Sequence, residues 1–289
     1  MTAPVAHVFD SRPCELGEGP LWHPIREQLF WFDIIGKRLL TRNGDAAQHW
    51  QFAEHVSAAG WIDRDRMLIA SDSALFRFDL TTGARENLCA LEADNPVTRS
   101  NDGRADPFGG FWIGTMGKAA EPGAGAIYRY FKGELRCLFK PVSISNAICF
   151  TPDGGHAHFT DTVTGQVMRV ALDGQGWPAA DPEVWLDLRT EGLHPDGAVV
   201  DATGTLWLAE WGVGRVAAYA PDGRLLRSVK VPAPHSTCPA FGGPDLTTLF
   251  CTSALQGLDA SARAAHPLSG QTFAVSGIAR GQYEHKVIL

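Results

Sequence analysis

Short apolar segments alternate along the chain with turns rich in Gly, Pro, Asp and Asn. One unit recurs: a small residue opens a hydrophobic strand, a turn follows, and a second apolar strand ends in a polar residue. The first copy runs from Gly19 to Pro24 and then from Leu29 to Asp33. The copies open at Gly19, Gly60, Gly103, Ala147, Gly197 and Ala240, at intervals of 41, 43, 44, 50 and 43 residues.

This spacing predicts the fold. A period of roughly 40–50 residues with four short strands per unit is typical of a β-propeller, and six copies predict six blades. Further strands with alternating apolar and polar residues complete the units, such as 75–79, 126–130, 166–170 and 215–219. The alternative, a two-domain β-sandwich, is disfavoured because sandwiches lack a regular repeat of this length.

The repeats extend over almost the whole chain, so we expect one propeller domain spanning residues 1–289. The N-terminal strand 5–9 is expected to pair with C-terminal strands such as 272–275 and so close the ring. No sustained period of 3.6 residues is present, which predicts little helix. Segment 260–270, rich in small residues, is interpreted as a surface loop, and Trp31, Trp112 and Trp207 as fillers between blades.

Composition and charge narrow the range of functions. The net charge is −7 and no basic cluster is present, so we expect no nucleic-acid partner. No segment is long and apolar enough to span a membrane, and residues 1–7 do not read as a signal peptide. The six scattered cysteines favour reduced thiols in a cytoplasmic protein, although a periplasmic location stays open. We expect a monomer.

Candidate chemistry emerges when the copies are aligned. The residues immediately before the six opening positions are Glu18, Ala59, Asp102, Asn146, Asp196 and Pro239. Equivalent positions in successive blades lie at one height around the channel axis, so the four oxygen-bearing side chains are expected to converge at one mouth of the channel. Crowded carboxylates repel one another, and a divalent cation relieves that repulsion. The competing interpretation is that Asp and Asn simply occupy turns.

Four motifs carry a resemblance over nearly the whole chain. Residues 16–22 (LGEGPLW), 99–103 (RSNDG), 145–147 (SNA) and 195–197 (PDG) resemble, in order and spacing, motifs of the gluconolactonase/regucalcin (senescence marker protein) family. The likeness is greatest to bacterial sugar-acid lactonases such as xylonolactonases. The resemblance implies a propeller enzyme that hydrolyses a small sugar lactone with the help of one divalent metal ion.

The resemblance also implies roles for individual residues. Glu18, Asn146 and Asp196 would bind the metal, Arg99 and Asn101 would contact the substrate, and Asp102 would lie near the metal. One departure concerns the motif Gly114-Thr115-Met116, after which eukaryotic members often place a substrate-facing Glu three residues on. This chain has Ala119 there and Glu121 two positions later, so Glu121 is the corresponding candidate.

The expected reaction is hydrolysis of a xylono- or gluconolactone to the aldonic acid. The metal would polarise the lactone carbonyl, while Asp196 or a hydroxide generated on the metal would activate the nucleophile. An all-oxygen ligand set favours Ca²⁺, Mg²⁺ or Mn²⁺, and Zn²⁺ or Fe²⁺ also fits three protein ligands. His194 flanks Asp196 and is a candidate neighbour of the site.

Three other functions remain possible for such a propeller. A non-enzymatic calcium- or sugar-binding protein would bind without turnover. A phosphotriesterase or aryl-lactonase would need a more apolar pocket, which the polar Arg99 and Asn101 argue against. A protein-interaction propeller would present aromatic residues on its top face, not an acidic ring around the axis. Serine-esterase chemistry is unsupported because no G-x-S-x-G motif is present.

Overall fold

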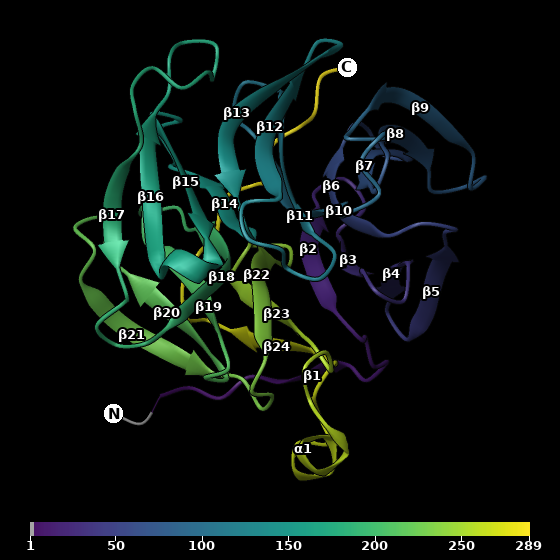
Figure 1. Cartoon of the computed structure of the whole chain (residues 1–289). Helices are drawn as coiled ribbons and strands as arrows, with labels where there is room; N and C mark the ends of the chain where they lie inside the picture. Colours follow the sequence, from purple (N-terminus) through teal and green to yellow (C-terminus); the bar gives the residue numbers. More distant parts are fainter. Residues whose placement is uncertain (1–2) are drawn as a thin grey trace.

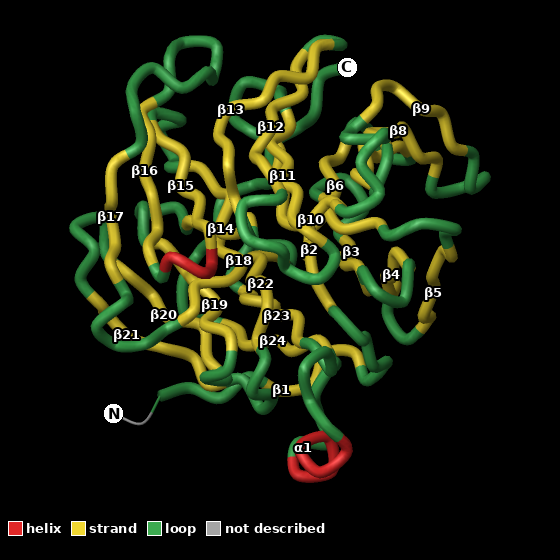
Figure 2. Tube along the Cα trace, in the orientation of Figure 1, coloured by secondary structure: helices red, strands yellow, loops and turns green. Residues whose placement is uncertain are grey.

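The computed structural model describes residues 3–289. Met1 and Thr2, which begin both the predicted domain and the N-terminal segment, lie outside the described residues. Six four-stranded antiparallel sheets are arranged in a ring, and strands dominate the trace (Figures 1 and 2). The predicted six-bladed β-propeller is therefore confirmed. No helix within residues 3–289 has the length and hydrophobicity needed to cross a membrane.

Each sheet is built from four strands, which follow one another from the innermost strand outward. The first contains β2 (Gly17–His23), β3 (Gln28–Asp33), β4 (Arg38–Asn43) and β5 (Ala46–Gln51). The second contains β6 (Val56–Trp61), β7 (Arg66–Ser71), β8 (Ala74–Asp79) and β9 (Arg85–Ala90). The third contains β10 (Thr98–Ala105), β11 (Phe111–Gly117), β12 (Gly125–Phe131) and β13 (Glu134–Val142).

The remaining sheets follow the same order. The fourth contains β14 (Ser145–Phe150), β15 (His156–Asp161), β16 (Gln166–Ala171) and β17 (Glu183–Asp187). The fifth contains β18 (His194–Val200), β19 (Leu206–Trp211), β20 (Arg215–Tyr219) and β21 (Leu225–Lys230). The sixth contains β22 (Ser236–Gly242), β23 (Thr248–Ser253), β24 (Thr272–Ser276) and, outermost, β1 (His7–Asp10).

The inner strands β2, β6, β10, β14, β18 and β22 follow one another around the central channel, and β22 contacts β2. The core is divided into apolar clusters between adjacent blades. Trp31 packs in a cluster with Phe250, Trp112 lies at the edge of Phe150, and Trp207 at the edge of Phe241. The three tryptophans are fully buried, as predicted for fillers between blades.

Two local predictions were wrong. Residues 260–270 are not entirely loop, because Ala260–Ala265 form the short helix α1. Asp259 starts this helix: its side chain accepts a hydrogen bond from the Ala262 backbone amide, which satisfies one of the free N–H groups of the first turn. The N-terminal strand begins at His7 instead of Val5, which forms an isolated bridge with Lys230.

The segment after β24 returns to the channel. The Gln282 side chain donates to the carbonyls of Phe150 and Val200, and the Trp61 indole donates to the Glu284 carbonyl. Phe150, Val200 and Trp61 are the last residues of their inner strands. The C-terminal segment therefore crosses the end of the channel at which the inner strands finish, and the opposite mouth remains for a site.

Candidate functional site

A β-bulge interrupts every inner strand near its start. In all six sheets the pairing between the inner strand and its neighbour shifts by one residue in this region. A bulge turns side chains away from simple alternation, and bulges concentrate beside functional sites. Gly19 and Ala147 follow Glu18 and Asn146 with positive φ angles of 53° and 55°. Such a backbone is unusual for alanine and marks a locally constrained site.

The pairing beyond each bulge defines which residues are equivalent. When the second strands of the six blades are aligned, one equivalent position in each of them has a paired residue on the inner strand. The inner-strand residues three positions before these paired residues are equivalent to one another. They are Glu18, Ser57, Asn101, Asn146, Asp196 and Thr237. All six side chains bear oxygen. The predicted alignment is therefore correct in three blades and wrong in the other three, where it selects Ala59, Asp102 and Pro239.

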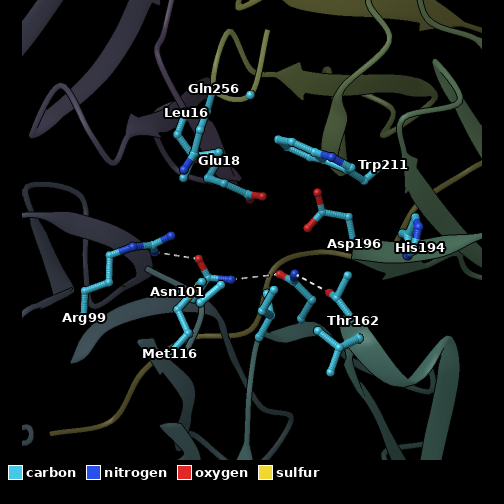
Figure 3. Close-up of a pocket in the computed structure, with 15 residues that line it drawn as sticks. Leu16, Glu18, Arg99, Asn101, Met116, Thr162, His194, Asp196, Trp211 and Gln256 are labelled. Atoms are coloured by element: carbon cyan, nitrogen blue, oxygen red, sulfur yellow. Dashed lines mark hydrogen bonds between the residues drawn. The ribbon is translucent and has the colours of Figure 1, made fainter. Parts of the chain in front are cut away.

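Part of this ring opens into one cavity at the mouth where the inner strands begin. The cavity has a volume of about 550 Å³, within the usual range for small-molecule sites. Its polar lining includes Glu18, Arg99, Asn101, Asn146, Thr162 and Asp196. The structure thus brings five predicted site residues to one cavity, and Figure 3 shows the carboxylates of Glu18 and Asp196 directed into the same space.

The two carboxylates are in an unfavourable environment. Both are at most 5 % exposed. Burial, together with the negative charge of Asp102, raises the pKa of Glu18 to about 8. Burial and the nearby charge of Glu18 raise the pKa of Asp196 well above its usual range. Each ionised carboxylate therefore lacks enough solvent or counter-charge, which is the condition that a bound cation would relieve.

Hydrogen bonds fix the amides beside the carboxylates. The Asn101 Nδ2 donates to the Asn146 Oδ1 over 3.1 Å, and the Asn146 Nδ2 donates to the Thr162 hydroxyl over 2.9 Å (Figure 3). Thr162 in turn donates to the Pro195 carbonyl. Arg99 donates from Nη1 to the Asn101 Oδ1 over 2.7 Å. This chain of bonds orients the side-chain oxygen of Asn146 and connects three blades around the cavity.

Asp102 lies outside the cavity lining. It is buried, and its carboxylate accepts a hydrogen bond from the Ile148 amide over 2.7 Å. Burial raises the pKa of Asp102 to about 6, while this bond and the positive charge of Arg104 act in the opposite direction. Asp102 therefore influences Glu18 and Asp196 through its charge instead of lining the cavity with them.

Glu121 and His194 differ from each other in their positions relative to the cavity. Glu121 is absent from the cavity lining, and its carboxylate accepts a hydrogen bond from the Ala119 amide within its own turn. The side chain that was predicted to contact the substrate therefore makes a local hydrogen bond. His194 does line the cavity, next to Asp196, as its place in the chain suggested.

Sequence reasoning missed Trp211 as part of the cavity wall. Trp211 ends β19, and its indole stacks on His235 with a centroid separation of 4.0 Å and an interplanar angle of 14°. The His235 ring makes a 2.9 Å hydrogen bond with the Gln256 carbonyl, and Gln256 also lines the cavity. The Trp211 ring is therefore held as a flat apolar wall beside Asp196 (Figure 3). The only sequence signal was a tryptophan at a strand end, which had no distinguishing pattern.

The donor chemistry fits a hard divalent cation. No group of three His, Cys, Asp or Glu side chains placed to hold a metal occurs within residues 3–289. Glu18, Asn146 and Asp196 instead offer two carboxylates and one amide oxygen around a buried space, and oxygen ligands suit Ca²⁺, Mg²⁺ or Mn²⁺. The raised pKa values of the carboxylates agree with a site that lacks compensating positive charge.

The fold and this cavity define a propeller with an acidic, oxygen-rich pocket at one channel mouth. Residues 16–255 match the model of the SMP-30/Gluconolactonase/LRE-like region. The chain belongs to this family. The resemblance stated from the four motifs is therefore confirmed.

Individual relatives cover nearly the full chain. A Rhizobium meliloti protein, provisionally named a sugar lactone lactonase, is 43 % identical over 93 % of this chain and 92 % of its own length. The 6-deoxy-6-sulfogluconolactonase of Pseudomonas putida is 33 % identical over 91 % of each chain. A crystal structure described as the calcium-binding protein regucalcin from Agrobacterium tumefaciens is 40 % identical, covers 100 % of both chains and superimposes with a TM-score of 0.97.

Proposed function

We propose that this protein hydrolyses a sugar lactone of the xylono- or gluconolactone type to the aldonic acid, using one divalent metal ion held by Glu18, Asn146 and Asp196. One observation carries the proposal: two buried carboxylates and an oriented amide oxygen share a cavity with Arg99 and Asn101. Membership of the family and the lactonase names of relatives that cover about nine-tenths of the chain support the same reaction class.

The residues have distinct tasks in this reaction. Arg99 and Asn101 contact the substrate, Asn101 orienting the ring hydroxyls, and the flat face of Trp211 packs against the apolar face of the sugar ring. Asp196 accepts a proton from the attacking water at a carboxylate oxygen. The water oxygen bonds to the carbonyl carbon, the ring C–O bond breaks, and the departing ring oxygen receives the proton that Asp196 took from the water. A bound divalent cation would supply electrostatic stabilisation of the negative charge that develops on the carbonyl oxygen.

The direct test is acid release from xylonolactone and gluconolactone. The protein is treated with chelator and then assayed with Ca²⁺, Mg²⁺, Mn²⁺, Zn²⁺ or Fe²⁺ added singly. We expect chelation to abolish activity and one ion to restore it. Asp196→Asn should lose roughly 100-fold or more in kcat, as expected for removal of a general base. Asp222→Asn is the matched control, because Asp222 lies on an exposed turn.

The alternative is a propeller that binds calcium or sugar without turnover. The description of the Agrobacterium relative as calcium-binding is the observation that favours it. Calorimetry on the same chelated protein separates the two functions. Metal binding accompanied by lactone opening no faster than the spontaneous rate, with every ion, would reject the lactonase function and support the binding protein.

A further inference from the structure

Arg99 differs from the other deeply buried arginines in its partners. Arg104 pairs with Glu284, and Arg129 pairs with Asp106 over 2.7 Å. Arg99 is 4 % exposed, yet within residues 3–289 its hydrogen bonds go only to the neutral oxygens of Ser100 and Asn101. Both bonds come from Nη1, so Nη2 has no protein partner among the described residues. A buried guanidinium without a carboxylate partner is costly, which makes this arrangement unusual.

The acidic groups around Arg99 are engaged elsewhere. Asp72 makes a 3.0 Å contact with His55 and a 3.7 Å contact with Lys118. Glu18 accepts from the Gly19 amide and faces the shared space with Asp196. None of these carboxylates forms an ion pair with Arg99, although the charges of Glu18, Asp72 and Asp196 reach it through space.

The charges that line the cavity also bear on the pairing of Arg99. Its charged lining residues are Glu18, Asp196 and Arg99. If a divalent cation is bound as proposed above, the two carboxylates balance that ion. The remaining positive charge belongs to Arg99. Burial lowers the pKa of Arg99 to about 10, although the charges of Glu18, Asp72 and Asp196 act in the opposite direction.

We propose that Arg99 binds an anionic substituent of the substrate, so that the preferred lactones carry a second acidic group, such as a carboxylate, away from the lactone carbonyl. This inference rests on the proposed lactonase function and extends its substrate class from neutral aldonolactones to lactones that carry a second acidic group. The substituent takes no part in the bond changes. It forms a charge-assisted hydrogen bond with the guanidinium, which has no carboxylate in direct contact among the described residues.

Two lactones with the same ring provide the test. D-glucaro-1,4-lactone and D-glucono-1,4-lactone differ in having a carboxylate or a hydroxymethyl group at the far end. With the metal-loaded enzyme we expect kcat/KM to favour the glucarolactone by roughly 10-fold or more. Arg99→Gln should lower kcat/KM for the glucarolactone by roughly 10- to 100-fold and for the gluconolactone by a much smaller factor. Arg99→Lys should retain part of the preference.

The control is Arg64→Gln, which removes an exposed arginine whose bond to the Ile25 carbonyl is 3.4 Å long. It should leave both activities unchanged. Should Arg99→Gln fail to fold, inhibition of the wild-type enzyme by glucarate and gluconate replaces it, and glucarate should bind more tightly.

Each remaining outcome is decisive. Equal or better hydrolysis of the gluconolactone overturns the inference and leaves the lactonase function intact. Equal losses on both substrates in Arg99→Gln also overturn it, because they indicate that Arg99 binds hydroxyls or the reacting group. Hydrolysis of neither these two lactones nor xylonolactone overturns the lactonase function and the inference with it.

Discussion

The ion pair between Arg104 and Glu284 gives a quantitative prediction about how the C-terminal segment stabilises the propeller. The two side chains are 9 % and 7 % exposed, so the pair is almost removed from solvent. The Arg104 guanidinium also donates to the Ala198 carbonyl over 3.4 Å. Burial alone would lower the pKa of Arg104, but the Glu284 carboxylate raises it above its usual range. The guanidinium therefore depends on this partner.

The expected cost follows from the burial. Glu284→Gln leaves a buried positive charge without its counter-ion, which costs about 3–5 kcal/mol in the free energy of unfolding. Arg104→Met leaves the Glu284 carboxylate buried and should cost a similar amount. The double variant removes both charges together. We expect it to be less destabilised than the sum of the single variants by at least about 1 kcal/mol, because neither charge remains unpaired.

Urea denaturation followed by tryptophan fluorescence at pH 7 measures all three variants against the wild type. The control pair is Arg136 and Glu134, whose side chains are each 54 % exposed. Its variants should change stability far less, because solvent screens exposed ion pairs. A loss below about 1 kcal/mol in Glu284→Gln, or strict additivity in the double variant, would refute the argument that burial makes this pair essential.

Three further outcomes follow from single side chains. Trp211→Ala should raise KM for the sugar lactone by roughly 5-fold with a smaller effect on kcat, because it removes a stacking wall worth about 1 kcal/mol; unchanged steady-state kinetics would contradict this role. Glu121→Gln should leave kcat/KM unchanged within about two-fold, since its carboxylate caps its own turn, and a larger loss would show that it reaches the substrate. Burial lowers the pKa of His158 to about 3. Below pH 6.5 this residue therefore binds more protons in the unfolded chain than in the folded protein. The stability of the folded protein should fall with decreasing pH by up to about 1.4 kcal/mol per pH unit from this residue. His158→Phe should flatten that dependence in urea titrations between pH 5 and 7, and an unaltered slope would argue against it.

The sequence by itself determined the architecture. The repeat of apolar strands and polar turns predicted six blades because each blade buries the same faces against its neighbours. The tryptophans between blades followed from the same pattern. The alignment of the repeats also placed Glu18, Asn146 and Asp196 together, because equivalent positions around a closed ring must lie at one height.

Tertiary structure decided the details of the site. Arg104 pairs with Trp112, so Asn101, three positions earlier, takes the level that the alignment assigned to Asp102. A bulge adds one residue and so reverses which face of the sheet the neighbouring side chains point to. The apolar period of the sequence does not show at which residue this happens.

Contacts between distant segments were equally inaccessible from the sequence. Glu284 meets Arg104 across 180 positions, and Trp211 joins the cavity only when blade five closes onto the ring. The composition of residues 260–270 likewise did not reveal that a single cap at Asp259 starts a helix. Local patterns fix which strands form, whereas the counter-charges and walls of the site depend on segments that come together only when the chain folds.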